Sequence, residues 1–150
     1  MTPTITIIRG LPGSGKTRLA RRLAKKHGTL LIEPDMFLIR NGAYHYDPIK
    51  YQFATAAAIQ CIQTAAKLRA DIIYADVLPR IVQAMSLIEL YQAACPAKTS
   101  YQIIDCKHLT TQQSIRRNTH NVRPEDIHKM AADWQPYTPA KSCNAMQCQN

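Results

Sequence analysis

The feature that most constrains this chain is the segment Gly10-Leu11-Pro12-Gly13-Ser14-Gly15-Lys16-Thr17, which fits the phosphate-binding loop pattern G-x-x-x-x-G-K-[ST]. The β-branched stretch from Thr4 to Ile8 predicts a buried strand directly before it, and residues 18–26 favour a helix directly after it. Strand, loop and helix in this order are the context in which the pattern holds phosphate. The sequence therefore predicts a nucleotide-binding site near its N-terminus.

The residue types in this loop account for the prediction. Glycine lets backbone N–H groups turn inward around phosphate oxygens without a Cβ in the way, and three of the five glycines of the chain lie in the loop. The N-terminus of the following helix adds partial positive charge. In this pattern Lys16 reaches the β- and γ-phosphates and the hydroxyl of Thr17 holds Mg²⁺, so we expect ATP and Mg²⁺ as ligands.

The size and composition of the chain fit one compact domain. With 150 residues and 46% hydrophobic content, we expect a domain over residues 1–137 and a poorly ordered tail over 138–150, with order declining from Gln135. No apolar run reaches the roughly 18 residues of a membrane span, and the first strand begins directly at the N-terminus. We therefore expect no signal peptide, no membrane association and a cytoplasmic location. Cys143 and Cys148 in the tail would lack two ligands for a metal site.

The chain is basic, with a formal net charge of +9. Such a charge favours a polyanionic partner, and together with the phosphate loop it indicates contact with nucleic acid. The alternative is that solvated basic faces are common in small proteins and that the phosphate loop accounts for part of the charge.

Strand and helix patterns alternate along the chain. Strands are predicted at 4–8, 29–32, 71–76 and 100–105, and helices at 15–27, 48–69, 80–94, 110–119 and 124–134. Asp47-Pro48 is typical of a helix start, since the aspartate can accept hydrogen bonds from the first N–H groups. The alternation predicts an α/β fold, a parallel sheet of about four to five strands with helices on both faces. Ligands of such sheets bind where the strands end.

Two aspartates follow strands at that edge. Asp35, just past the second strand, could accept a proton from an attacking hydroxyl; alternatively it is a turn or cap residue after Pro34. Asp76 ends the apolar run 72–75 and could orient Mg²⁺ or a water, or otherwise cap the next helix.

Basic and aromatic residues are the remaining candidates. Arginines at the junction of the last two predicted helices could stabilise a transferring phosphoryl group, or form a solvated basic face: Arg116, Arg117 and Arg123. Others could line a groove for substrate phosphates: Arg40, Lys50 and Arg80. Tyr44 and Tyr46 could stack a base or pack a loop. The histidines show no metal-ligand spacing, and His120 alone lies near the predicted junction.

With these residues in hand, the chain resembles the P-loop kinases related to bacteriophage polynucleotide 5′-hydroxyl kinase, described broadly as AAA-domain or zeta-toxin-like ATP-binding proteins. The resemblance runs from about Ile5 to Tyr137. It rests on the phosphate loop with its preceding Arg9, on Asp35, on the stretch 42–50, on the strand ending at Asp76, and on the stretches 117–124 and 127–130.

The resemblance implies a P-loop kinase fold with a helical lid and a role for each matching residue. Lys16 and Thr17 bind the triphosphate and Mg²⁺, Asp35 is the general base, Arg117 is the lid arginine, and Asp76 matches an active-site aspartate. Three departures concern the acceptor site. Met36 replaces a second aspartate, Val77-Leu78 replaces Thr-Asn, and Leu38 stands where the phage enzyme has an arginine, with Arg40 nearby but out of register.

The sequence therefore predicts an ATP- and Mg²⁺-dependent kinase whose acceptor is the 5′-hydroxyl of a nucleic acid. In this prediction Arg40, Asp76 and Arg80 bind the acceptor. Two alternatives stay open: a small-molecule or nucleotide-sugar kinase of the zeta-toxin type, and a nucleotide-regulated nucleic-acid-binding protein with little turnover. The sequence leaves the oligomeric state undefined.

Overall fold

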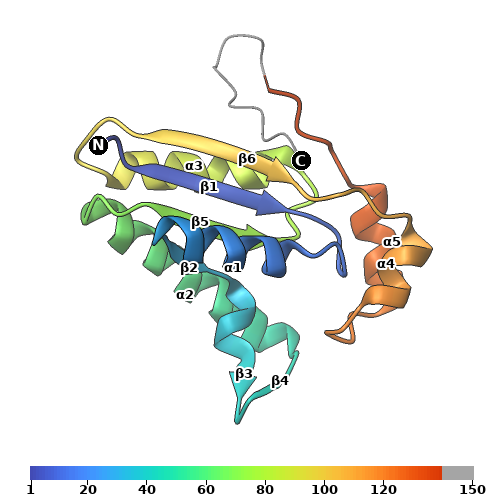
Figure 1. Ribbon diagram of the computed structural model, residues 1–150. Coiled ribbons are helices and arrows are strands. Elements are labelled where there is room, and N and C mark those ends of the chain that lie inside the picture. Colours follow the sequence, from blue (N-terminus) through green and yellow to red (C-terminus); the bar gives the residue numbers. More distant parts are fainter. Residues whose placement is uncertain (140–150) are drawn as a thin grey trace.

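A computed structural model of the chain describes residues 1–139, and its centre is a four-stranded parallel sheet (Figure 1). The strands stand in the order β2-β5-β1-β6. Their bounds are Thr4–Arg9 for β1, Leu30–Ile32 for β2, Ile72–Asp76 for β5 and Ser100–Asp105 for β6. Ile7 of β1 is in register with Tyr74 of β5 and Ile103 of β6. The predicted parallel α/β sheet is confirmed, with four strands in the described part of the chain.

Helices cover both faces of this sheet because successive strand residues point to opposite sides. The bounds are Lys16–His27 for α1, Pro48–Lys67 for α2 and Ile81–Ala94 for α3. Ile8 of β1 belongs to a buried cluster with Ala20 of α1. The preceding residue, Ile7, belongs to a second cluster with Ile62 of α2 and Ile88 of α3. One face thus packs against α1 and the other against α2 and α3 (Figure 1).

The connection between β2 and α2 contains short elements where the sequence analysis predicts neither helix nor strand. A 3₁₀ helix, η1, spans Pro34–Leu38, and β3 (Ile39–Arg40) pairs with β4 (Ala43–Tyr44) in an antiparallel hairpin. Asn41 and Gly42 form its turn with φ of 50° and 77°, values that asparagine and glycine tolerate best. The predicted helix start is confirmed, since the Asp47 side chain accepts from the N–H groups of Ile49 and Lys50.

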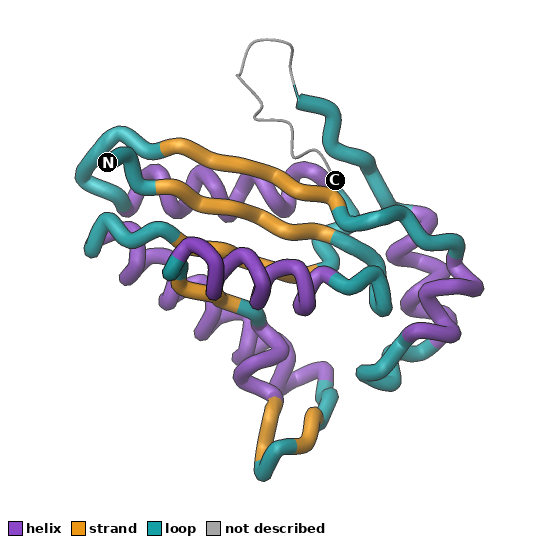
Figure 2. Tube along the Cα trace, in the orientation of Figure 1, coloured by secondary structure: helices purple, strands orange, loops and turns teal. Residues whose placement is uncertain are grey.

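Two short helices lie at the carboxyl ends of the strands. They are α4 (Thr111–Arg117) and α5 (Pro124–Ala132). Thr110 forms a capping box with Gln113 at the start of α4, and Pro124 occupies the first turn of α5, where no N–H is needed. Figure 2 shows the loops that follow β1 and β6 gathering at this edge beside the two helices. The edge where sequence reasoning places the ligand is therefore partly enclosed.

After α5 the chain returns to the sheet as a short segment, residues 134–137, which we call the strap. The expectation that order declines from Gln135 is wrong for this segment. Gln135 N donates to Pro79 O at 2.8 Å, and Tyr137 N donates to a carboxylate oxygen of Asp105 at 2.7 Å. The physical reason is Arg9, a fully buried cation that needs partners from the strap.

Arg9 ends β1 and connects the sheet to the strap. Its guanidinium donates twice to the Asp105 carboxylate, at 2.8 and 3.2 Å, and once to the carbonyl of Gln135. The guanidinium carbon lies 4.7 Å from the centroid of the Trp134 ring, within the range of a cation–π contact. These contacts neutralise a charge that burial would otherwise make costly.

The remaining expectations concern the membrane and the tail. In the part of the chain that the structure describes, no helix has the length and apolar character to cross a bilayer. Cys143, Cys148 and most of the predicted tail lie outside the described residues.

Candidate active site

The phosphate loop, Gly10–Thr17, joins the end of β1 to the start of α1. Gly13 and Gly15 have φ of 76° and 86°, a region that L side chains rarely adopt. No side chain caps α1 and no acidic residue lies in its first turn. A Cβ placed on Gly15 would meet no atom within 4 Å, so open space adjoins the loop. The first-turn N–H groups and the positive end of the helix can therefore receive an anion.

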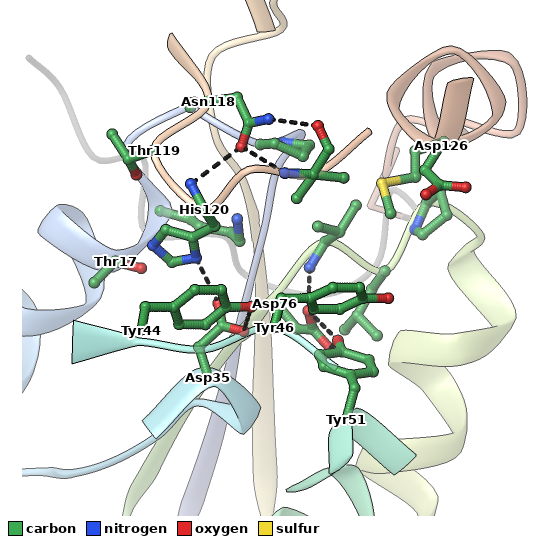
Figure 3. Close-up of a pocket in the computed structure, with 18 of the residues that line it drawn as sticks. Thr17, Asp35, Tyr44, Tyr46, Tyr51, Asp76, Asn118, Thr119, His120 and Asp126 are labelled. Atoms are coloured by element: carbon green, nitrogen blue, oxygen red, sulfur yellow. Dashed lines mark hydrogen bonds and ion pairs between the residues drawn. The ribbon is translucent and has the colours of Figure 1, made fainter. Parts of the chain in front are cut away.

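A large cavity, about 1180 Å³, lies at the carboxyl edge of the sheet. Ligand pockets typically span about 300–1,000 Å³, so this one has room for a nucleotide and a second substrate. Its walls include predicted site residues that lie up to about a hundred positions apart in the chain: Pro12, Gly13, Gly15, Lys16, Thr17, Asp35, Asp76 and Arg117. Figure 3 shows Thr17, Asp35 and Asp76 around this space.

Five predicted site residues do not line the large cavity: Gly10, Leu11, Ser14, Arg40 and Arg80. Leu11 is buried, and a Cβ on Gly10 would collide with Ser14 and Cys106. These loop residues therefore pack against the protein interior and do not face the cavity. Arg80 pairs instead with Asp133 at 2.9 Å, which ties the start of α3 to the end of α5. Arg40 lines a separate, smaller cavity.

Asp35 lies on η1, and both of its carboxylate oxygens are engaged. Tyr44 donates its hydroxyl to Oδ1 at 3.1 Å, and His120 Nδ1 lies 3.3 Å from Oδ2. Burial alone would raise the pKa of Asp35. The hydrogen bond and charge of His120, then Tyr44 and the charge of Lys16, outweigh burial and hold that pKa below its usual value. Asp35 is therefore ionised at neutral pH and faces a cation of the phosphate loop.

His120 reaches Asp35 from the loop between α4 and α5, which we call the lid loop (residues 118–123). Asn118 organises this loop, because its Oδ1 accepts from the N–H groups of His120 and Val122 and its Nδ2 donates to Val122 O. The His120 ring also packs on Tyr44, with centroids 4.3 Å apart. Figure 3 shows the two rings beside Asp35. The lid loop thus closes over the candidate base.

Asp76 ends β5 and is held by several donors. Tyr51 donates its hydroxyl to the two oxygens at 3.1 Å each, and Val77 N donates at 2.7 Å. Tyr74 lies at 3.4 Å from the second oxygen. Burial raises the pKa of Asp76 despite these donors and the charge of Lys16. Asp35 and Asp76 thus share one cavity in different electrostatic settings, with the pKa lowered in one and raised in the other.

The phosphate loop and α4 are in direct contact. Ser114 is fully buried and donates its hydroxyl to the carbonyl of Pro12 at 2.6 Å. A Cβ placed on Gly13 would lie 2.5 Å from Arg117 Cβ, closer than atoms allow. Glycine at this position therefore permits α4 to approach, and the approach brings Arg117 to the wall of the cavity.

Sequence reasoning missed several of these side chains. It places His120 near the junction without a role in the site, and gives Tyr51 and Asn118 no role. The position of His120 near the junction is the one signal in the sequence, because hydrogen-bond partners from distant elements leave no local pattern. Of the two roles considered for Tyr44, the structure bears on loop packing: Tyr44 contacts Asp35 and packs against His120. Its role in base stacking stays a prediction.

The phosphate loop after the first strand, the parallel sheet and the two helices over its edge define a P-loop kinase fold. A family model, AAA_33, described as an AAA domain, matches residues 5–135. The chain belongs to this AAA domain family, and the resemblance inferred from its sequence is confirmed.

One curated relative is NEDD4-binding protein 2 from Homo sapiens, which is 31% identical over 144 residues. The match covers 89% of this chain and 8% of that protein. The chain therefore spans less than a tenth of the length of this relative.

Solved structures of low sequence identity share the fold. A chain of the Pnkp1/Rnl/Hen1 RNA repair complex matches with a TM-score of 0.66 and 18% identity, covering 88% of this chain and 44% of that one. A gluconokinase from Sinorhizobium meliloti 1021 matches with 0.55 and 13%, covering 89% and 76%. The complex AvrRxo1-ORF1:-ORF2 with ATP matches with 0.56 and 20%, covering 77% and 40%. At these identities the likeness shows the fold.

Proposed function

We propose that this protein is an ATP- and Mg²⁺-dependent kinase that transfers the γ-phosphoryl group to a hydroxyl, and that its acceptor is the 5′-hydroxyl of a nucleic acid. One observation carries the proposal: the phosphate loop and the ionised Asp35 line the same cavity, which has room for two substrates. A phosphate donor on the loop and a hydroxyl at Asp35 would then meet in that space.

The roles of the residues follow from this arrangement. The loop N–H groups and Lys16 hold the β- and γ-phosphates, and Arg117 lies over the transferring group from the side of α4. Asp35 accepts the proton of the acceptor hydroxyl while the oxygen of that hydroxyl bonds to the γ-phosphorus. The bond from that phosphorus to the β–γ bridging oxygen breaks, and ADP leaves with the electron pair.

The residues present also fit a magnesium ion. The Thr17 hydroxyl and the Asp76 carboxylate line the cavity, and oxygen ligands are what Mg²⁺ prefers. Within residues 1–139 no group of three or more histidine, cysteine or acidic side chains could hold a metal alone. This suits an ion held by one or two protein oxygens and by substrate phosphates. When bound, Mg²⁺ neutralises charge on those phosphates.

Nucleic acid is favoured as the acceptor by the net charge of +9. The RNA repair complex among the structural matches agrees with this choice. A sugar or nucleotide-sugar acceptor is the second candidate, because Tyr44, Tyr46, Tyr51 and Asp76 line the acceptor side and such groups also bind hydroxylated rings. The gluconokinase match agrees with that candidate. A binding protein with little turnover is the third.

A transfer assay with labelled ATP separates the candidates. We expect label in a 5′-hydroxyl oligonucleotide, and a loss of about 10²–10⁴-fold in rate for Asp35→Asn, the usual contribution of a general base. Calorimetry should show MgATP binding retained in this variant. Glu89→Gln, an exposed carboxylate on α3 outside the cavity, is the matched control and should keep full activity. Label only in a sugar would favour the second candidate, and MgATP binding without transfer would favour the third.

A further inference from the structure

A second cavity, of about 330 Å³, is built by the same segments that line the large one. Its lining residues alternate along the chain with those of the large cavity. On η1, Asp35 faces the large cavity and Phe37 the second. After β4, Tyr46 lines the large cavity and His45 the second. On α2 the same alternation places Phe53 in the second cavity, which we call the hairpin cavity.

The hairpin cavity combines cationic and aromatic side chains. Arg40 and Lys50 are exposed at it, and no acidic residue lines it. Lys50 faces Asp47 at 3.9 Å, but both side chains are at least 40% exposed, and such a pair contributes little. Phe37 and Phe53 are 46% and 72% exposed, which leaves ring surface open to a ligand. Exposed aromatic surface beside positive charge is the chemistry that binds a nucleobase together with its phosphate.

The hairpin cavity is also close to the candidate base. Asp35 and Phe37 are two residues apart, so their Cα atoms lie within about 7.6 Å, since consecutive Cα atoms are about 3.8 Å apart. A nucleic-acid strand whose 5′-terminal hydroxyl lies at Asp35 can therefore reach the hairpin cavity within its first few nucleotides. A single nucleotide or a free sugar at Asp35 has no second base to place there.

We propose that the hairpin cavity is a subsite for a single-stranded nucleic acid, binding a base of one of the nucleotides that follow the 5′ end on Phe37 and Phe53, and a phosphate on Arg40 and Lys50. This inference rests on the proposed function, because it extends the acceptor site at Asp35. The subsite would explain how Arg40 binds the acceptor although it does not line the large cavity. It makes acceptor length the property that the protein recognises.

The test measures binding directly and does not depend on phosphoryl transfer. Fluorescence anisotropy with 5′-hydroxyl strands of about eight nucleotides, labelled at the 3′ end, gives the Kd of oligodeoxythymidylate and of oligouridylate. Phe53→Ala removes an exposed ring without touching the core, and Arg40→Ala removes one cation. The matched controls are Leu68→Ala and Lys67→Ala, which are exposed at the opposite end of α2.

We expect Phe53→Ala to raise the Kd of both strands about 5- to 150-fold, the range that base–aromatic stacking supports. Arg40→Ala should flatten the log–log dependence of binding on salt by about 0.7. The controls should change neither quantity.

Other outcomes separate this inference from the proposed function. If no acceptor is phosphorylated but Phe53→Ala and Arg40→Ala still weaken strand binding, the subsite stands and the kinase proposal fails. If strands are phosphorylated and both variants bind them as the parent does, the subsite is wrong. It is also wrong if the controls weaken binding equally, or if Phe53→Ala only dissociates a dimer in sedimentation and leaves strand binding unchanged.

Discussion

At the scale of single residues, the candidate base is defined by partners from two other elements. Tyr44 of the hairpin and His120 of the lid loop each take one oxygen of Asp35. The histidine lowers the pKa of Asp35 more than the tyrosine does. The pKa of Asp35 is therefore coupled to the position of the lid loop, which carries His120.

This coupling predicts a change in pH dependence when His120 is replaced. A base must be ionised to act, so transfer should be lost as pH falls through the lowered pKa of Asp35. In His120→Gln the charge is gone and burial raises that pKa, so the acid limb of kcat/KM should move to higher pH. An NMR titration of the Asp35 carboxyl carbon in the nucleotide-free protein should move in the same direction. His128→Gln, exposed on α5 and outside the cavity, should change neither.

The lowered pKa of Asp35 also makes the stability of the fold fall as pH is lowered. The pKa of Asp35 is lower in the folded chain than in the unfolded one, so its interactions stabilise the fold above the unfolded pKa, and this contribution is lost as pH falls through the folded pKa.

An acid limb and an NMR titration that are identical in His120→Gln and the parent would show that His120 does not set the pKa of Asp35.

At the scale of elements, α4 is attached to the phosphate loop by one buried hydrogen bond. Ser114→Ala leaves the carbonyl of Pro12 buried without its donor, so we expect the free energy of unfolding to fall by about 1–3 kcal/mol. Because the same bond sets the distance between α4 and the loop, MgATP should also bind more weakly. Urea denaturation and calorimetry measure the two effects.

Ser86→Ala is the matched control for this prediction. Its hydroxyl donates to Val82 O on the exposed side of α3, so a change within about 0.5 kcal/mol is expected. Equal losses of stability in the two variants would contradict a special role for the bond between Ser114 and Pro12.

The elements show how much of the fold could be predicted. Each strand of the central sheet and each α-helix was found from hydrophobic pattern and caps, within about two residues at the ends. The β3–β4 hairpin was not, because each of its strands has two residues and carries no alternation to detect. Asp35, Asp76, Arg117 and most of the phosphate loop were predicted, and they share the large cavity. Arg40 and Arg80 were predicted at the acceptor and do not line it. His120 and Tyr51 were not, since their roles arise only from tertiary contacts.

At the scale of the whole molecule, the strap joins the last described segment to the first strand. Asp105→Asn leaves the fully buried Arg9 without its carboxylate, and breaking a buried pair from one side costs about 3–5 kcal/mol. We expect such a loss in urea unfolding. The fluorescence of Trp134, the single tryptophan of the sequence, should change in the native state as the strap loosens.

Asp133→Asn removes the carboxylate of a half-exposed pair with Arg80 and should cost about 0–1 kcal/mol. It is therefore the control for a lost charge near the same segment. If Asp105→Asn were no more destabilising than Asp133→Asn, and the native Trp134 fluorescence were unchanged, the strap would not hold the sheet as we describe.

The burial of Arg9 has a consequence for synthesis on the ribosome. Its carboxylate partner is 96 positions later in the chain and its carbonyl partner 126 positions later. While the nascent chain lengthens, β1 carries a cation that cannot enter an apolar interior without a counterion. The sheet can therefore complete its carboxyl edge only after nearly the whole domain has left the exit tunnel, and a nucleotide-binding competent loop should form late and in one cooperative step.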